Sequence, residues 1–235
     1  MRFISIFFAL FTSQIVFASE CNQQAVGATY QIQNKKINYN FELWLSPNQV
    51  IHRNLSTNIS ELWEKNSLGM VKLTRYFDTH KRGIEYQPNE LPESVKDWSE
   101  KQQLISNSLL TDMTLISTSG HGCDLTTKYQ KQQDGNSIEL EWLNNHSLVK
   151  KLVVRHKSNV VDQIQLTQLV TNSIERDEVL SALTKLYTTD FIDVGDNESD
   201  PFLLKMINLG FVKHGASGVY TADGQVVGED HHHHH

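Results

Sequence analysis

The sequence predicts an α+β fold in which one strongly curved, mostly antiparallel sheet forms a half-barrel. Most of the chain consists of short segments with alternating apolar and polar residues, separated by turn residues. A single segment with helical spacing interrupts them, and further helical patterns follow only in the last quarter of the chain. Strands followed by helices, without regular alternation, are typical of α+β proteins. We expect about nine strands in one sheet whose concave face is closed by the mid-chain helix and by C-terminal helices.

The first half of the chain is predicted to form a series of hairpins. Within residues 37–45, Tyr39 and Phe41 share one face, whereas Glu42 and Trp44 share the other. The turn at residues 46–48 then leads directly into the next predicted strand. The strands expected in this half are 28–33, 37–45, 49–54, 59–64, 70–77 and 83–86.

Residues 92–110 are predicted to form one amphipathic helix of about four turns. Pro92 suits the first turn of a helix. The apolar residues follow a spacing closer to 3.6 than to 2, at Val95, Trp98, Leu104, Ile105, Leu109 and Leu110. We expect the apolar side of this helix to lie over the concave face of the sheet as a lid.

Strands are predicted to resume after the lid and to give way to helices at the C-terminus. No long crossover separates the second set of strands, which favours antiparallel pairing. Asp200 and Pro201 are typical of the start of a helix, and Gly210 of its end. The expected strands are 113–117, 124–131, 137–142, 148–155 and 160–170, the expected helices are 174–187 and 201–209, and a last hairpin is expected at 219–227.

The ends of the chain predict an exported protein. Residues 1–18 have a basic start, an apolar run and a small residue, Ala18, which together are typical of a cleaved signal peptide. We therefore expect cleavage near Ala18 and a periplasmic or secreted protein. Residues 19–228 are expected to form a single domain, with a curved sheet at 19–170 that contains the helix 92–110, and a helical extension at 171–228. Residues 229–235 form a histidine-rich tail or tag.

The composition of the chain argues against nucleic acid as a partner and against a membrane-spanning segment. The formal net charge is −6, so the chain lacks the basic balance expected of a nucleic-acid-binding protein. No apolar run after the signal reaches the length of about 20 residues that spans a bilayer, so we expect no membrane-spanning segment.

Cys21 and Cys123 are the two cysteines of the chain. In an exported protein a lone pair is typical of one disulfide, which here would tie the N-terminus to mid-chain. The alternative is a reactive thiol or a metal ligand within residues 120–123, where His121 lies two residues before Cys123.

One arrangement of strands and helix is formed by residues 41–44, residues 61–64, the helix from Pro92, and the paired runs 137–142 and 148–154. This arrangement resembles the LolA/LolB family of periplasmic lipoprotein carriers. The resemblance covers roughly residues 28–170 and implies an open half-barrel whose helices cover an apolar cavity, with a lipidated protein as the ligand.

Four tryptophans mark the candidate cavity. If the sheet curves, some of the indoles should line its concave side and meet the mid-chain helix. Packing of all four in a solid core is the alternative. The candidate cavity residues are Trp44, Trp63, Trp98, Trp142, Leu104 and Ile105.

Metal chemistry is predicted only for the histidine tail. Adjacent imidazoles bind Zn or Cu, so a native tail would handle these metals, whereas an expression tag would have no such role. The acidic residues between Asp190 and Asp200 could bind calcium, but we favour a solvated loop. The tail consists of His231, His232, His233, His234 and His235.

The sequence thus predicts a non-enzymatic binding protein. The expected ligand is an apolar small molecule, such as a lipid or an acyl chain, or a lipidated protein. Apart from possible Zn or Cu at the tail, we expect no cofactor. A metal-binding protein that uses the tail is the second hypothesis. A hydrolase that uses acidic residues is the third hypothesis. It ranks last because no nucleophile, base and orienting group can be assembled from the sequence.

Overall fold

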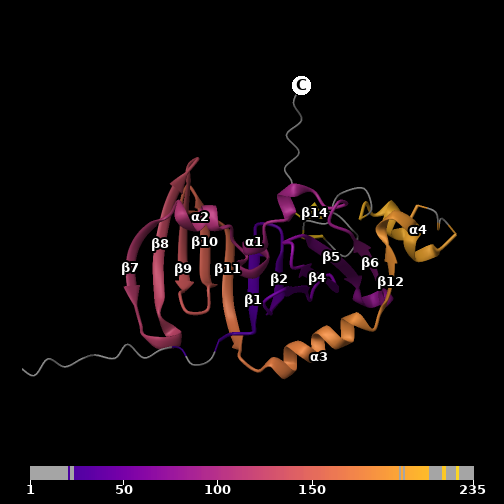
Figure 1. Ribbon diagram of the computed structural model, residues 1–235. Coiled ribbons are helices and arrows are strands. Elements are labelled where there is room, and N and C mark those ends of the chain that lie inside the picture. Colours follow the sequence, from indigo (N-terminus) through magenta and orange to yellow (C-terminus); the bar gives the residue numbers. More distant parts are fainter. Residues whose placement is uncertain are drawn as a thin grey trace, which may run out of the picture.

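The computed structural model describes Cys21, residues 24–195, residue 197, residues 199–211 and the backbone of 219–220 and 226–227. The predicted signal peptide and the histidine tail lie outside these residues. The fold class is confirmed, because the chain forms one open, curved and mostly antiparallel sheet (Figure 1). This sheet has twelve strands, and eleven of them match the strand ranges expected from the sequence, although we put the number at about nine; the strand at residues 187–190 was not expected. No helix in the described part of the chain is long and apolar enough to cross a membrane.

Two series of hairpins make up the sheet. The first series comprises β1 (Gly27–Asn34), β2 (Asn38–Leu45), β3 (Gln49–Asn54), β4 (Ile59–Lys65), β5 (Val71–Phe77) and β6 (Arg82–Tyr86). The second comprises β7 (Thr114–Ser119), β8 (Thr126–Gln133), β9 (Asn136–Leu143), β10 (Leu148–His156) and β11 (Asn159–Val170). Pairing of β1 with β11 joins the two series, and β12 (Tyr187–Asp190) lies beside β6 at the far edge.

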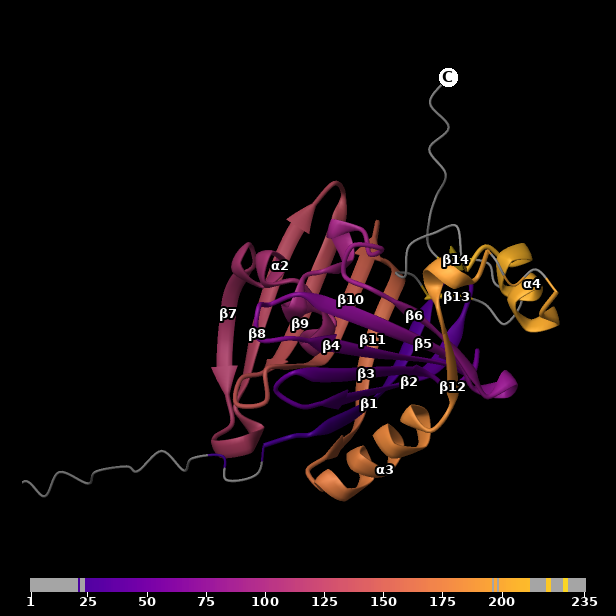
Figure 2. The ribbon, with the colours of Figure 1, turned by 45° about the vertical axis from the view of Figure 1, so that its right-hand side comes forward.

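The sheet bends strongly between its two series of strands. Figure 2 shows β2–β5 running steeply across β8–β11, with α2 inside the angle between them and α3 outside it. A register shift between Thr29 and Tyr30, where β1 pairs with β11, lies at the junction of the two series. Such bulges bend a strand and increase its twist. The predicted half-barrel curvature therefore coincides with an irregularity in the strand pairing.

The lid is built from two short helices, so the prediction of one helix over residues 92–110 is wrong. The segment forms η2 (Glu93–Val95), α1 (Trp98–Gln103) and α2 (Asn107–Thr111). The Asp97 side chain caps α1 and the Ser106 side chain caps α2. Between the two helices Leu104 has a φ of 63°, which ends α1 in a left-handed conformation. Capping side chains at both starts thus divide a segment whose apolar spacing is continuous.

The C-terminal extension contributes one strand to the main sheet, which corrects the prediction of a helical extension with only a last hairpin. Helix α3 (Ser173–Thr184) is followed by β12, which pairs in parallel with β6. Next come η4 (Phe191–Asp193) and α4 (Pro201–Asn208), whose predicted cap Asp200 accepts hydrogen bonds from two backbone amides. The expected last hairpin is present as β13 (Val219–Tyr220) and β14 (Val226–Val227). Two further turns are η1 (Asp78–His80) and η3 (Gly122–Asp124).

Each face of the sheet has its own apolar cluster. The inner face packs against the lid and against α4, and its cluster includes Tyr30, Trp63 and Tyr86. The outer face packs against α3, with Trp44 among its buried residues. Near the end of α4, Phe211 is buried against Phe77 of the inner face, with ring centroids 4.9 Å apart. The extension therefore fills one end of the concave face, and the lid covers its middle.

Two buried tyrosines of the inner face provide a test of this core. Tyr30 is fully buried, and its hydroxyl has no hydrogen-bond partner among the described residues. The Tyr86 hydroxyl donates to the carbonyl oxygen of Phe211 at 3.0 Å. Because an unpaired buried hydroxyl costs free energy, we expect Tyr30→Phe to raise the free energy of unfolding by about 1 kcal/mol and Tyr86→Phe to lower it by about 1 kcal/mol. Urea denaturation of both variants measures this, and a loss for Tyr30→Phe would contradict the packing described.

Candidate ligand cavity

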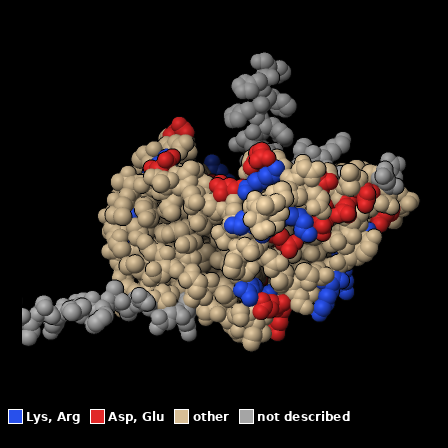
Figure 3. All heavy atoms as spheres, viewed as in Figure 1, with Lys and Arg blue, Asp and Glu red and all other residues tan. Residues whose placement is uncertain are grey.

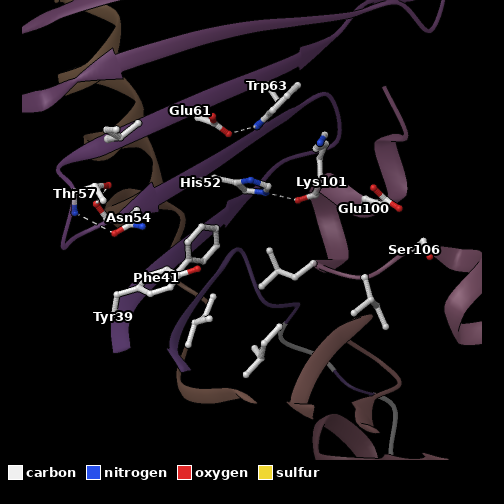
Figure 4. A pocket seen from close by; sticks show the side chains of 15 residues that line it. Tyr39, Phe41, His52, Asn54, Thr57, Glu61, Trp63, Glu100, Lys101 and Ser106 are labelled. Atoms are coloured by element: carbon white, nitrogen blue, oxygen red, sulfur yellow. Dashed lines mark hydrogen bonds between the residues drawn. The ribbon is translucent and has the colours of Figure 1, made fainter. Parts of the chain in front are cut away.

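A cavity of about 470 Å³ lies between the inner face of the sheet and the lid (Figure 4). Eight of the fifteen lining residues are apolar or aromatic, and the other seven are polar or charged. The lining residues are Ile32, Tyr39, Phe41, His52, Asn54, Thr57, Ile59, Glu61, Trp63, Glu100, Lys101, Leu104, Ile105, Ser106 and Ile164.

Strand alternation and register explain which sheet residues reach the cavity. Successive side chains of a strand point to opposite faces, so alternate residues of one strand point inward. Phe41 on β2 lies opposite Asn54 on β3, and His52 on β3 lies opposite Glu61 on β4. On the other side, Ile32 of β1 pairs with Ile164 of β11, which extends the apolar wall across the junction of the two series.

The lid contributes the remaining wall through the break between α1 and α2. Leu104 and Ile105 occupy this break, and both line the cavity. The left-handed conformation of Leu104 is unfavourable for a residue with a branched side chain. It is held in place by burial of the adjacent Ile105, which is 6% exposed. Lid and sheet are also joined by a hydrogen bond from His52 Nε2 to the carbonyl oxygen of Lys101, at 2.7 Å.

An ion pair whose cation is buried lies on the inner face beside the cavity. Arg75 is fully buried, and its Nε and Nη2 atoms donate to Glu61 Oε1 at 3.0 and 2.7 Å. The other oxygen of Glu61 accepts from Trp63 Nε1 at 3.2 Å. The guanidinium also lies 5.9 Å from the ring centroid of Tyr86. This network fixes the orientation of the Trp63 indole at the cavity wall.

Lys101 places a second cation at this wall. The residue is 8% exposed, and its Nζ lies 4.2 Å from the centroid of the Trp63 ring. Figure 4 shows its side chain rising from α1 toward Trp63. Burial lowers the pKa of Lys101, although the negative charges of Glu61 and Glu100 act in the opposite direction. Burial likewise lowers the pKa of His52, against the opposing effect of Glu61. The wall therefore favours a neutral imidazole next to an ammonium that is poorly solvated.

The structure brings three of the six predicted cavity residues into the wall. Trp63, Leu104 and Ile105 line the cavity. Trp44 lies on the outer face in the cluster with α3. Trp98 stacks under Lys65 Nζ, which lies 4.9 Å from its ring, and Trp142 is buried in the inner core on β9.

Sequence reasoning missed several wall residues. For Tyr39 and Phe41 a signal existed, because the alternation of their strand already put them on one face, opposite to Trp44. His52, Glu61 and Lys101 meet only through tertiary structure. No local pattern identified them.

The predicted disulfide joins Cys21 to Cys123, with an S–S distance of 2.09 Å across 102 residues of sequence. The histidine beside it is His146, and not the sequence neighbour His121, which is exposed. Nε2 of His146 lies 4.0 Å from Cys21 Sγ, and its Nδ1 accepts a hydrogen bond from the Ala25 amide at 3.2 Å. Cys21, Cys123 and His146 thus have the proximity of a metal site. The disulfide, however, uses both sulfurs, and the Ala25 bond leaves the proton on Nε2, where a metal would have to bind.

The other predicted metal residues do not form a site among the described residues. Asp200 is engaged as the cap of α4 and as the partner of Arg82. Asp190 ends β12 at the edge of the sheet. Asp196 and Glu198 lie outside the described residues, as do His231–His235. Metal binding at the tail stays a prediction.

Substitution of Glu61 tests the buried ion pair. We expect Glu61→Gln to lower the free energy of unfolding by about 3 kcal/mol, because it removes the anion that compensates a buried guanidinium. Denaturant unfolding monitored by tryptophan fluorescence measures this loss. Glu141→Gln is the control, since its partner Lys128 is 52% exposed and such exposed pairs contribute at most about 1 kcal/mol. Equal losses in the two variants would contradict the role given to Glu61.

Protonation of His146 is expected to destabilise the fold. Burial lowers the pKa of His146 below its ordinary value of 6.5, so the unfolded chain takes up a proton more readily than the folded chain. The stability linked to this group is complete above pH 6.5 and is lost as the pH falls through the lowered pKa of the folded state. We expect His146→Gln to flatten the fall of melting temperature in this acidic range. The control is His121→Gln, which removes an exposed imidazole near the same disulfide, and an unchanged slope for His146→Gln would be evidence against this linkage.

No protein-family model and no curated protein matches the sequence. Among solved structures the chain is similar to PNGF-II, with 12% identity and a TM-score of 0.38 over 74% of this chain and 32% of that one. It is also similar to MucB, with 15% identity and a TM-score of 0.35 over 66% of this chain and 56% of that one. The MucA/MucB complex of Pseudomonas aeruginosa gives 15% identity and a TM-score of 0.35, over 61% and 50%. The chain spans less than two thirds of each of these structures, and likenesses this distant assign it no activity.

Proposed function

We propose that this protein is an exported binding protein that holds an apolar ligand, such as a lipid or an acyl chain, in the cavity between sheet and lid. The observation that carries the proposal is this cavity, of whose fifteen lining residues eight are apolar or aromatic, and which is covered by a segment separate from the strands. Its volume of about 470 Å³ lies within the usual range of small-molecule sites.

The distribution of charge supports an apolar ligand. On the face of the molecule drawn in Figure 3, few charged side chains lie over β7–β11 and more lie over the other elements. Strand register places Lys128 and Lys151 of this region opposite Glu141, so these charges share one face of the sheet. The other side of these strands continues the apolar wall at Ile164, and its charges include Lys131 opposite Ile138 and Asp162 opposite Val154.

The construction of the lid supports reversible access to the cavity. Helix α1 has six residues and α2 has five, and helices this short are marginal without tertiary contacts. Their position therefore depends on Ile105, on Leu104 and on the bond from His52. A lid held by few contacts can open at modest cost and close over a bound chain.

The polar groups of the wall favour binding over catalysis. Glu61 accepts from Arg75 and Trp63, and His52 donates to the lid backbone, so both groups already serve structural bonds. The disulfide supports export, because such bonds persist in oxidising compartments. We accordingly place the mature protein in the periplasm or outside the cell.

Filling the cavity should weaken ligand binding. We expect wild-type protein to bind a fluorescent fatty acid with saturable enhancement of emission, and Ile164→Trp to weaken this binding at least tenfold, because the larger side chain occupies the cavity. Gln163→Trp is the matched control, since it adds the same bulk to the opposite face of the same strand. Titration of the dye against each variant gives the dissociation constants.

Lipid analysis of the purified protein provides a second readout. We expect solvent extraction of protein exported by its own host to release a stoichiometric lipid. If the wild-type protein neither binds the dye nor yields extracted lipid, the proposal is wrong. Equal weakening by the two tryptophan variants would place the binding elsewhere on the molecule.

A further inference from the structure

Resting on the proposed function, we propose that the ligand is a single-chain amphiphile with an anionic head group, and that the ammonium of Lys101 holds this head group at the Trp63 end of the cavity. The acyl chain then runs along the apolar wall toward Tyr39 and Phe41. The volume of the cavity alone does not identify this class of ligand.

The first support is the state of the Lys101 side chain. It is 8% exposed and lines the cavity, yet it forms no ion pair with any carboxylate of the described residues. Its described contact is the face of the Trp63 ring, 4.2 Å from Nζ. A buried charge is costly unless it is paired, and an aromatic face compensates only part of that cost. A ligand anion would supply the missing partner.

The second support is that the charge of Glu61 is already matched, and that Glu100, which also lines the cavity, forms no ion pair with Lys101. Glu61 uses one oxygen for Arg75 and the other for Trp63, so its charge is matched by the guanidinium. Figure 4 shows Glu100 on the side of α1 turned away from Glu61 and His52. Close to the cavity wall, Lys101 therefore remains as the cation available to a ligand.

The third support is the polarity of the cavity along its length. Figure 4 shows Lys101, Trp63 and Glu61 at one end and Tyr39 and Phe41 at the other, where the uncharged polar side chains of Asn54 and Thr57 also lie. Tyr39 is paired in register with Ile32, which in turn is paired with Ile164, so the apolar end continues into the second series of strands. A cavity with a cationic end and an apolar end matches an amphiphile better than it matches a hydrocarbon.

Ligands that share a chain and differ in head group test the inference. We would measure displacement of a neutral fluorescent dye by hexadecanoic acid, hexadecan-1-ol and hexadecyl phosphate, at about pH 8, where the carboxylic acid is ionised. Wild-type protein should bind the acid about tenfold or more tightly than the alcohol, since bonds to charged groups are the stronger ones. Tighter binding of the phosphate than of the acid would identify a phosphate head group, and the reverse a carboxylate. Either result supports the anionic class.

Two lysine variants assign the preference to one residue. Lys101→Met keeps the apolar stem and removes the charge, so the ratio of acid to alcohol affinity should fall toward one. Lys65→Met is the matched control, because Lys65 also stacks on an indole, that of Trp98, but lies outside the cavity wall. It should keep the wild-type ratio. Circular dichroism checks that each variant is folded, and Lys101→Gln replaces Lys101→Met if the latter is not.

The outcomes separate this inference from the function on which it rests. If none of the three ligands displaces the dye and the dye itself does not bind, the proposed function fails. If acid and alcohol bind wild-type protein equally well, the ligand class is wrong and the binding function stands. If the wild-type preference for the acid survives in the folded Lys101 variant, the anion is held elsewhere and the role of Lys101 is overturned.

Discussion

The pairing of β1 with β11 is the constraint on which the rest of the structure depends. It joins the first strand of one series of hairpins to the last strand of the other, and thereby puts β6 and β7 far apart in the sheet. Ten strand spacings separate them, about 48 Å measured along the sheet at ~4.8 Å per spacing. The chain between β6 and β7 must cross that distance, and on a curved sheet the concave side offers the shorter path. Residues 87–113 therefore cover the inner face. On the outer face of the sheet, α3 likewise leads from β11 across the first series of strands to β12 at the far edge.

The cavity follows from this crossing. A segment that spans a wide concave surface with two helices of six and five residues cannot fill the hollow beneath it as closely as a continuous helix would. At one end the C-terminal extension completes the core through Phe202, Leu203 and Phe211. In the middle, Leu104 and Ile105 reach into the concave face, and the remaining space stays open. The open space thus lies where neither the lid nor the extension packs fully against the sheet.

Alternation along the strands predicted the fold class and the inner face well, because a period of two depends only on local sequence. Trp44 shows that the position of a residue in its strand predicts the face that it occupies better than its size does. Its strand position put it opposite to Tyr39 and Phe41, yet its size suggested a cavity residue, and the structure follows the strand position. The break in the lid was visible in part, since Asp97 and Ser106 are good N-caps, but the regular apolar spacing concealed it. Contacts between His52, Glu61 and Lys101 join β3, β4 and α1, and no local pattern encodes such contacts.

One network links the buried ion pair to the lid. Arg75 fixes Glu61, Glu61 fixes the Trp63 indole, and the face of that indole receives the Lys101 ammonium. The backbone carbonyl of the same Lys101 accepts the bond from His52 that ties α1 to the sheet. The residue with the least satisfied charge at the cavity is therefore also the residue at which the lid is attached. An anion bound at Nζ stabilises the closed lid relative to the open lid. The size of this stabilisation is the difference between the binding free energies of the anion to the two states. In this geometry the charge of the ligand and the closure of the lid act on the same residue, which couples recognition of the head group to retention of the chain.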